Sequence, residues 1–335
     1  MDDRLSGLSD DLLLKILSCV CLKYAVRSSV LSPRWRYLWT SLPTLTLSTL
    51  DFKTLHNLSN FVTHLLSRRN NQLPLSSLNL FLRVKHAHHV GQRIINHAFS
   101  FNVDHVNINC VYGTSYDDLK PRFASLPGSQ TLKRLTLSRP PSRCDEIVLT
   151  SAQEFSSLTT LHLRFISFYD GFLSMCPNLK NLTLLGCKVT GPDVSTICHP
   201  RLSNLTLEKS TAKSDLIGTR PINVVTPQLK NLIVLNYNGV LRVSAPELAS
   251  LLVRGPCPFE FSTDGFPCLE KALLDFDSVH LSGAYDRNLS NSYASTIISL
   301  LQEFHYVKLL SLSMEIIQVV LEPGVSQEAA SPFLG

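Results

Sequence analysis

The pattern L-x-x-L-x-L recurs along most of the chain and constrains the fold more than any other feature of the sequence. Successive clear copies begin 26, 21, 23 and 27 residues apart, which is within the range of roughly 20–29 residues that is typical of short solenoid repeats. A single unit of this kind leaves an apolar face uncovered, so neighbouring units have to stack. Clear copies begin at Leu132, Leu158, Leu179, Leu202 and Leu229, and weaker ones at Leu42, Leu75, Val103, Leu248, Leu269 and Val307.

The last L-x-L of each copy is expected to lie on a short strand, with alternate side chains facing inward. Stacked units of this type form a curved leucine-rich-repeat solenoid with a parallel sheet along its concave side. We therefore predict an α/β solenoid over residues 48–321, followed by a polar tail over residues 322–335. Connecting segments such as residues 172–177 are short and end in proline, which favours a brief helix or turn.

Residues beside the inward leucines are expected on the concave face of the sheet. Small polar residues at these positions suit a strand that is exposed on one side, and they suit a recognition surface equally well. The possible recognition face comprises Thr136, Thr159, His162, Arg164, Thr183 and Thr206.

A second pattern, with helical spacing, occupies residues 8–39. The first helix has Asp10 and Asp11 in its first turn, where negative charge is favourable, with Ser9 or Asp10 as its cap. A second helix is expected around residues 24–31. The third begins with Ser32 as N-cap and Pro33 at its first position, where a missing N–H costs little. Apolar residues follow at helical spacing: Leu12, Leu13, Ile16, Leu17 and Val20 in the first helix, Val26 and Val30 in the second, and Trp35, Leu38 and Trp39 in the third.

Three helices of this length cannot bury two tryptophans together with their own apolar faces. Some of this surface must meet the next domain or another protein. A helical cap that seals the end of the repeat array and a docking site for a partner are equally compatible with the pattern.

The residues L-x-D-x-L-L-x-x-I-L-S from Leu8, then A-V-R-S-S-V-L-S from Ala25, then R-W-R-Y-L-W from Arg34 resemble an F-box of the kind found in plant F-box proteins with leucine-rich repeats. Two positions depart from the family's usual proline, Ser9 and Cys21. Serine can still cap the first helix, whereas Cys21 loosens the expected turn between the first two helices.

The resemblance implies a three-helix F-box over residues 1–47 that docks a Skp-family adaptor, and through it a cullin and a RING subunit. The protein would then be the substrate-recognition subunit of an SCF-type ubiquitin ligase, with the repeats recruiting an unidentified target. The adaptor-binding residues that the resemblance implies are Leu8, Leu12, Leu13, Ile16, Leu17, Val26, Val30, Pro33, Trp35, Leu38 and Trp39.

Members of this family often carry a further module, the FBD domain, after the repeats. The sequence EPGVSQEAASPFLG at residues 322–335 has the composition of a polar tail. We therefore expect the FBD module to be absent or truncated in this chain.

Composition limits the cellular locations and the classes of binding partner that we expect for this chain. Nine scattered cysteines, an acidic start at Asp2 and Asp3 and the absence of an eighteen-residue apolar run predict reduced thiols, no membrane span and a cytoplasmic or nuclear location. Residues 51–143 carry twelve Lys and Arg against four Asp and Glu. No basic run with interleaved aromatic residues accompanies this excess, so we do not expect a nucleic-acid surface.

The sequence offers no recognisable active site. The cluster of His86, His88 and His89 has no acidic or cysteine partner at metal-ligand spacing, and there is no phosphate-binding glycine loop or nucleophile elbow. We expect neither a metal nor a cofactor, and no catalysis by this chain. Two rival functions remain, an interaction scaffold whose helices only cap the array and a receptor whose repeats bind a small molecule or a nucleic acid.

Overall fold

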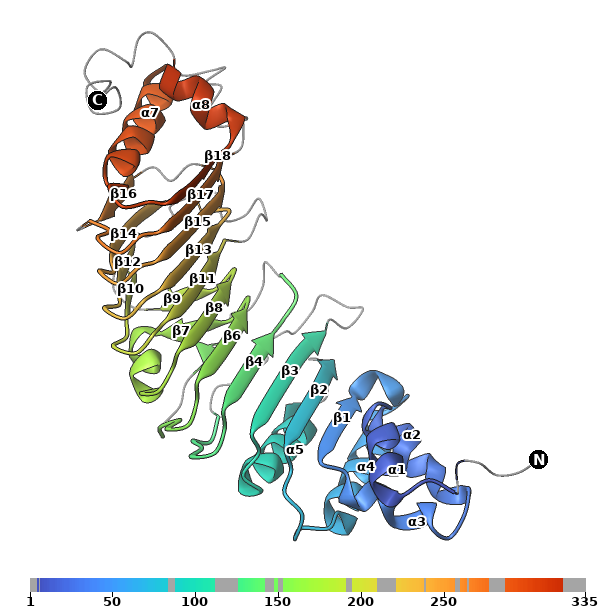
Figure 1. Cartoon of the computed structure of the whole chain (residues 1–335). Coiled ribbons are helices and arrows are strands. Elements are labelled where there is room, and N and C mark those ends of the chain that lie inside the picture. The colour runs from blue at the N-terminus through green and yellow to red at the C-terminus, as the bar shows by residue number, and fades with distance from the viewer. Residues whose placement is uncertain are drawn as a thin grey trace. The chain divides into compact units, whose positions relative to one another are not determined.

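The chain divides into two compact units, Met1–Phe168 and Tyr169–Gly335, which are drawn in Figure 1 from a computed structural model. Each unit is built on parallel strands. The structure describes residues 5, 7–83, 88–111, 126–141, 148–149, 153–190, 195–209, 221–237, 239–256, 260–263, 265–276 and 287–321. The tail predicted at residues 322–335 lies outside them.

The N-terminal unit begins with short helices and continues as a parallel sheet in the order β1-β2-β3-β4-β6. The predicted α/β class, with helices followed by parallel strands, is confirmed. Its helical elements are α1 (Asp10–Ser18), α2 (Leu22–Arg27), η1 (Ser28–Val30), α3 (Trp35–Leu38), η2 (Trp39–Ser41), η3 (Thr49–Asp51), α4 (Leu55–Arg68) and α5 (His88–Ser100). Its strands are β1 (Thr44–Ser48), β2 (Ser77–Arg83), β3 (His105–Val111), β4 (Arg134–Ser138), β5 (Val148–Leu149), β6 (Thr160–Arg164) and β7 (Ser167–Tyr169).

Two helix boundaries differ from the prediction. The second helix ends at Arg27 and continues as the 3₁₀ turn η1. The regular part of the third helix begins at Trp35 rather than at Pro33, because Ser32 and Pro33 form a preceding turn in which the Trp35 N–H bonds the Ser32 carbonyl. Tight turns of this kind commonly extend helix ends.

The repeated leucines stand in register across the sheet of the N-terminal unit. Each second leucine of the motif pairs with its counterpart on the next strand, and all are buried. Parallel strands with this register place one continuous apolar row on the inner face. The row consists of Leu45, Leu78, Val106, Leu135 and Leu161.

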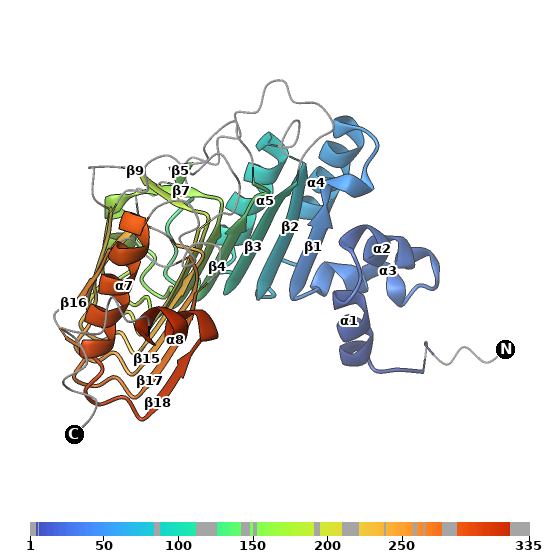
Figure 2. The same cartoon turned by 90° about the horizontal axis from the view of Figure 1, so that it is seen from above.

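Two long helices, α4 and α5, occupy the connections of the first repeats and lie along one side of the strands β1–β3 (Figure 2). Arg69 is buried after α4, although it stands next to Asn70 and Asn71, a sequence typical of a solvated turn. Its guanidinium donates to the carbonyls of Leu42, Asn70, Leu73 and Pro74. The cation therefore satisfies backbone acceptors that would otherwise be buried without a donor.

The C-terminal unit has a main parallel sheet in the order β8-β11-β13-β15-β17-β18 and a second parallel sheet in the order β10-β12-β14-β16. The elements are η4 (Asp170–Met175), β8 (Asn181–Leu185), β9 (Lys188–Thr190), β10 (Ser195–Cys198), β11 (Asn204–Glu208), β12 (Ile222–Val225), β13 (Asn231–Leu235), β14 (Val240–Ser244), β15 (Ser250–Gly255), β16 (Glu260–Thr263), β17 (Lys271–Phe276), α7 (Arg287–Gln302), β18 (Leu309–Leu312) and α8 (Met314–Leu321).

The second sheet replaces the brief helices or turns expected between repeats. Among the described connections of this unit, η4 is the brief helix that matches that expectation. In β14, Leu241 and Val243 are buried while Arg242 is exposed, which is the alternation of a strand with one covered face. The connections thus close the apolar interior with strands rather than helices.

In most repeats one backbone carbonyl fixes the register of the next repeat. The carbonyl that follows the first leucine of the motif accepts two N–H groups from the following unit. Lys133 O, for example, receives Thr159 N at 3.0 Å and Thr160 N at 3.1 Å. The same double acceptance occurs at Pro43, Ser76, Asp104, Lys180, Ser203, Lys230, Ala249 and Glu270. These bonds satisfy amides just ahead of each strand, where no strand ladder reaches them.

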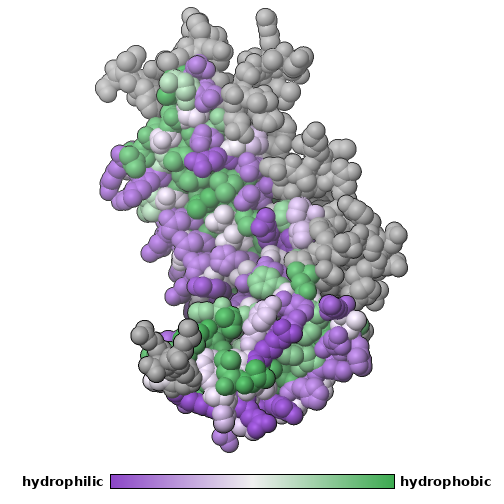
Figure 3. Space-filling view, turned by 90° about the vertical axis from the view of Figure 1, so that its right-hand side faces the viewer, coloured by the Kyte–Doolittle hydropathy of each residue, from purple (hydrophilic) through white to green (hydrophobic). Residues whose placement is uncertain are grey.

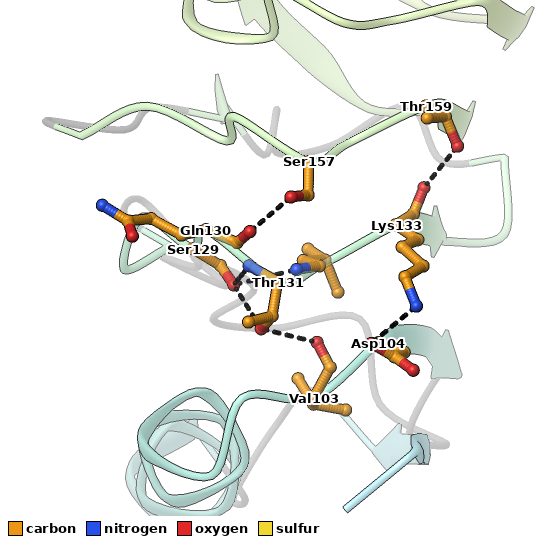
Figure 4. Close-up of polar contacts among 9 residues, drawn as sticks. Val103, Asp104, Ser129, Gln130, Thr131, Lys133, Ser157 and Thr159 are labelled. Carbon is orange, nitrogen blue, oxygen red and sulfur yellow. Dashed lines mark hydrogen bonds and ion pairs between the residues drawn. The ribbon is translucent and has the colours of Figure 1, made fainter.

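Side chains reinforce this ladder between β3, β4 and β6 (Figure 4). The Thr159 hydroxyl donates to Lys133 O at 3.1 Å, and Lys133 Nζ lies 3.3 Å from Asp104 Oδ1. The sequence predicts Thr159 on the strand, beside the inward leucines. In the structure it lies just before β6 and joins consecutive repeats.

A substitution at Leu205 tests whether the inward leucines stabilise the C-terminal unit. Leu205→Ala is expected to lower the free energy of unfolding by about 2–5 kcal/mol, because the side chain is fully enclosed and its removal leaves a cavity. The adjacent Thr206→Ala, on the opposite face, should change it by less than about 0.5 kcal/mol. Urea unfolding followed by circular dichroism measures both, and equal losses would contradict the assigned faces.

His199 is a buried ionisable group of the C-terminal unit. Its Nε2 lies 2.9 Å from the Cys176 carbonyl, and the Arg201 N–H donates to its Nδ1. This arrangement requires the neutral ring, because Nδ1 must accept. Burial lowers the pKa of His199, the Arg201 charge lowers it further, and the bond to Cys176 O opposes both.

A histidine with a lowered pKa makes folding sensitive to acid. The unfolded chain binds the proton first, so stability should fall as the pH drops below the ordinary histidine value of about 6.5 toward the lowered pKa of His199. His199→Gln should reduce the difference in unfolding free energy between pH 7.5 and pH 5, measured in urea. The exposed His305→Gln serves as the control and should keep the wild-type difference. An unchanged difference in His199→Gln would exclude this residue as the cause.

Candidate partner-docking surfaces

The first helix is anchored by one side only. Ser9 is its N-cap in extended conformation, and its carbonyl accepts the Leu13 N–H, although the serine side chain makes no capping bond. Leu13 and Leu17 are buried in the unit. Their preceding neighbours, Leu12 and Ile16, are exposed. The wide apolar face read from the sequence is thus split between core and surface.

Both tryptophans belong to the core of the N-terminal unit. Trp35 and Trp39 are buried together with Leu38. The start of this segment is tied to the start of α1, because Arg34 Nε and Nη2 lie 2.8 and 2.6 Å from Asp10 Oδ1 and Nη2 also donates to Leu8 O. Half-exposed ion pairs contribute little net stability, so this contact serves mainly to orient the two chain segments.

Further contacts join the helices to the first repeat. Cys21 Sγ donates to Asp51 Oδ2 at 2.8 Å, and Lys23 Nζ donates to the Asp51 carbonyl and lies over the ring of Phe52. Burial, followed by the bond to Asp51, raises the pKa of the Cys21 thiol. Together with the packing of α1 and α2 against β1, these contacts cover the first strand of the sheet.

A set of large apolar side chains remains exposed on the helices, and hydrophobic atoms gather at the lower end of Figure 3, over this segment. We call this set the helical patch. Leu12 is 47% exposed and Val30 88% exposed, although both are among the most apolar residue types. The helical patch consists of Leu12, Ile16, Val20, Tyr24, Val30, Leu31 and Tyr37.

The predicted adaptor-binding residues therefore fall into three groups. Their role in binding an adaptor stays a prediction. Leu13, Leu17, Trp35, Leu38 and Trp39 are buried; Leu8 and Val26 are half-buried; Leu12, Ile16, Val30 and Pro33 are exposed. The sequence prediction omitted Val20, Tyr24, Leu31 and Tyr37 from the binding set, of which only Val20 was signalled, by its helical spacing from Ile16.

The outward positions of the N-terminal strands form a second surface, the N-terminal open face. Thr136 and His162 are paired in register there with Asn107, and Arg164 is paired with Ser138. Burial lowers the pKa of His162, and the charge of Arg134 lowers it further. The predicted concave residues Thr136, His162 and Arg164 therefore share one polar and basic surface.

The corresponding surface of the C-terminal unit, the C-terminal open face, has a different composition. Thr183 and Thr206 are paired in register, but the same row continues as Ile233, Leu252 and Leu273. A ladder of asparagine side chains runs beside this row, with Asn204 Nδ2 donating to Asn181 Oδ1 and Asn231 Nδ2 to Asn204 Oδ1. An ion pair between Arg254 and Asp275 at 2.8 Å borders it.

Groups with catalytic potential are few in the described part of the chain. Burial raises the pKa of the Cys110 and Cys176 thiols to about 12, so neither is a thiolate at neutral pH. Among the described residues no three His, Cys, Asp or Glu side chains lie close enough together to hold a metal ion. His86 of the histidine cluster lies outside these residues, and the side chains of His88 and His89 are not described. No described helix is long and apolar enough to cross a membrane.

Comparison with known proteins agrees with this layout. Residues 5–47 match the F-box domain family model, which covers the helices and most of β1. An F-box/LRR-repeat protein of Arabidopsis thaliana is 30% identical over 271 residues, covering 75% of this chain and 82% of the relative. The chain belongs to the F-box/LRR-repeat family.

Two further Arabidopsis thaliana relatives of this F-box/LRR-repeat protein carry the FBD term in their names. A putative F-box/FBD/LRR-repeat protein is 28% identical over 82% of this chain, and another F-box/FBD/LRR-repeat protein is 30% identical over 71% of it. The chain spans 64% and 56% of their lengths, respectively. F-box domains in general bind Skp1-type adaptors, and F-box/LRR proteins are generally non-catalytic.

Substitution of two neighbours on α1 should separate core from surface. Leu13→Glu places a charge at a position with 0% exposure and should cost more than about 3 kcal/mol of unfolding free energy. Leu12→Glu should change it by less than about 0.5 kcal/mol, because a surface substitution leaves the packing intact. Thermal and urea unfolding measure both. A strongly destabilised Leu12→Glu would show that the outer half of α1 is also packed.

Proposed function

We propose that this F-box/LRR-repeat protein is the substrate-recognition subunit of an SCF-type ubiquitin ligase. In this proposal the helical patch docks a Skp-family adaptor, which connects the chain to a cullin and a RING subunit, and the repeats recruit a target protein. The observation that carries the proposal is that the segment matching the F-box model leaves the helical patch exposed while its tryptophans are buried.

The helical patch has the properties of a docking surface. Burial of apolar surface contributes about 25 cal/mol per Å², and large apolar side chains exposed together usually mark an interaction site. The helices that carry this patch are held in place by buried side chains, those of Leu13, Leu17 and Trp35. Because these helices are already fixed, little conformational freedom would be lost on binding.

Such a receptor would increase the rate of ubiquitin transfer by bringing the reacting groups close together. The chain would hold a target close to the ubiquitin carrier and increase the effective concentration of the acceptor lysine, while the bond chemistry takes place on other subunits. The F-box/LRR-repeat protein itself would be non-catalytic. It would act in the cytoplasm, the nucleus or both.

The scaffold alternative assigns the helices only a capping role. Packing of α1 and α2 against β1 supports such a role, but it uses the buried side of the helices and leaves the helical patch unexplained. Capping and adaptor docking can therefore operate together, on opposite sides of the same helices.

Binding of a purified Skp-family adaptor to the full chain, measured by calorimetry, tests the proposal. Leu12→Glu should weaken adaptor binding by about tenfold or more, because it places a charge in an apolar interface. Leu55→Glu is the matched control, since Leu55 is also a helical leucine and is 46% exposed, but it begins α4 outside the helical patch.

The control should bind the adaptor like the wild type. Absence of adaptor binding by a folded wild-type chain would refute the ligase proposal and favour the scaffold. Equal loss of binding in both variants would show that the docking surface lies elsewhere.

A further inference from the structure

Two arginines and two histidines share the N-terminal open face. His105 and Arg134 are register partners at the start of β3 and β4, and His162 and Arg164 follow on β6. On a strand, alternate residues face the same side, so all four lie on the side opposite the buried leucines. We call these four residues the basic cluster.

The basic cluster has no carboxylate on its own surface. The outward positions of β1, β2, β3, β4 and β6 carry threonine, serine, asparagine, phenylalanine, valine and basic residues, and none is acidic. The nearby carboxylate of Asp104 is already paired with Lys133. Arg164 stacks over the ring of Phe165, a contact that leaves its N–H groups able to bind an anion. The charge of this surface is thus uncompensated within the described part of the unit.

The cluster also has a defined extent. Arg134 and Arg164 lie on adjacent strands, and Arg164 is displaced by four residues along the strand relative to the partner of Arg134, Thr160. Strand spacing of about 4.8 Å and a rise of about 3.3 Å per residue separate the two Cα atoms by roughly 14 Å. An extended peptide of four or five residues spans this distance.

We propose that the basic cluster binds an acidic, carboxylate-rich segment of the target protein. The proposal rests on the ligase function above and specifies the chemistry of the target. Arg134 and Arg164 would each receive a carboxylate through their paired N–H groups, and His162 lies between them on the open face. Hydroxyl and amide side chains of Thr136 and Asn107 offer bonds to the peptide backbone.

An acidic polypeptide fits this surface better than a nucleic acid does. Nucleic-acid surfaces combine a long basic track with aromatic side chains on which bases stack. Here the four residues of the basic cluster lie on three strands, and Phe81 is the only phenylalanine, tyrosine or tryptophan at the outward positions described on the five strands. The polar rows beside the cluster suit a hydrogen-bonding peptide.

A fluorescent peptide of about twelve residues with alternating Glu and Ser is long enough to span the cluster and tests the inference on the full chain. The wild type should bind it, and binding should weaken as sodium chloride is raised, because salt screens exposed charges. The same peptide with Gln in place of Glu should not bind. A single-stranded oligonucleotide of similar length is the competing probe.

The variant Arg134→Gln/Arg164→Gln should weaken peptide binding by about tenfold or more, through loss of two charge contacts. The control Arg68→Gln/Arg93→Gln removes the same net charge from two exposed positions, the last residue of α4 and the middle of α5. It should bind within about twofold of the wild type, since distant exposed charges are screened. Unfolding curves of both double variants serve as the check on folding.

Several outcomes would overturn the inference: no binding by the wild type, an equal loss in both double variants, or tighter binding of the oligonucleotide than of the acidic peptide. Adaptor binding is measured on the same samples. A chain that binds the adaptor but not the peptide retains the proposed ligase function and refutes only the acidic-target inference.

Discussion

The structure depends on one backbone arrangement that recurs in most motifs: the carbonyl after the first leucine accepts two amides from the next repeat. It fixes where each strand begins, and the buried first leucine holds that carbonyl in place. Because side chains alternate along a strand, a fixed starting point determines which residues face inward in every repeat. The same bonds recur in both units, at Asp104 and Lys133 in one and at Lys180 and Lys230 in the other.

Fixed register explains why the open faces can vary freely. Inward positions are restricted to leucine and similar residues by packing, whereas outward positions carry no comparable restriction. The row that reads Thr136 and His162 in one unit can therefore read Ile233 and Leu252 in the other without changing the fold. The variable side chains and the stabilising leucines lie on opposite sides of the same strands.

Much of this architecture could be predicted from the sequence, because the repeated leucines report strand positions directly: every predicted copy, down to the degenerate one at Val307, precedes a strand. The secondary structure of the connections could not be predicted.

Short segments such as Ile222–Val225 are compatible with strand or helix, and only contact with a neighbouring repeat decides between them. Arg69 stands next to Asn70 and Asn71 like a residue of a solvated turn, and charged residues are rarely buried. Its four carbonyl partners come from turns whose proximity no local pattern reveals. Helical spacing located the apolar face of α1. It did not show where on that face the buried side chains end and the exposed side chains begin.

That dividing line has a functional consequence. If the F-box helices used one set of side chains both to pack against β1 and to bind a partner, changes in partner affinity would also change stability. Here Leu13 and Leu17 face the unit while Leu12 and Ile16 face solvent, so the two properties are carried by different residues on the same helix. The repeats follow the same rule, with leucines inward and the basic cluster outward. In the proposed receptor role, the target surface can change without disturbing the docking helices, because the residues of both surfaces face away from the core that stabilises the unit.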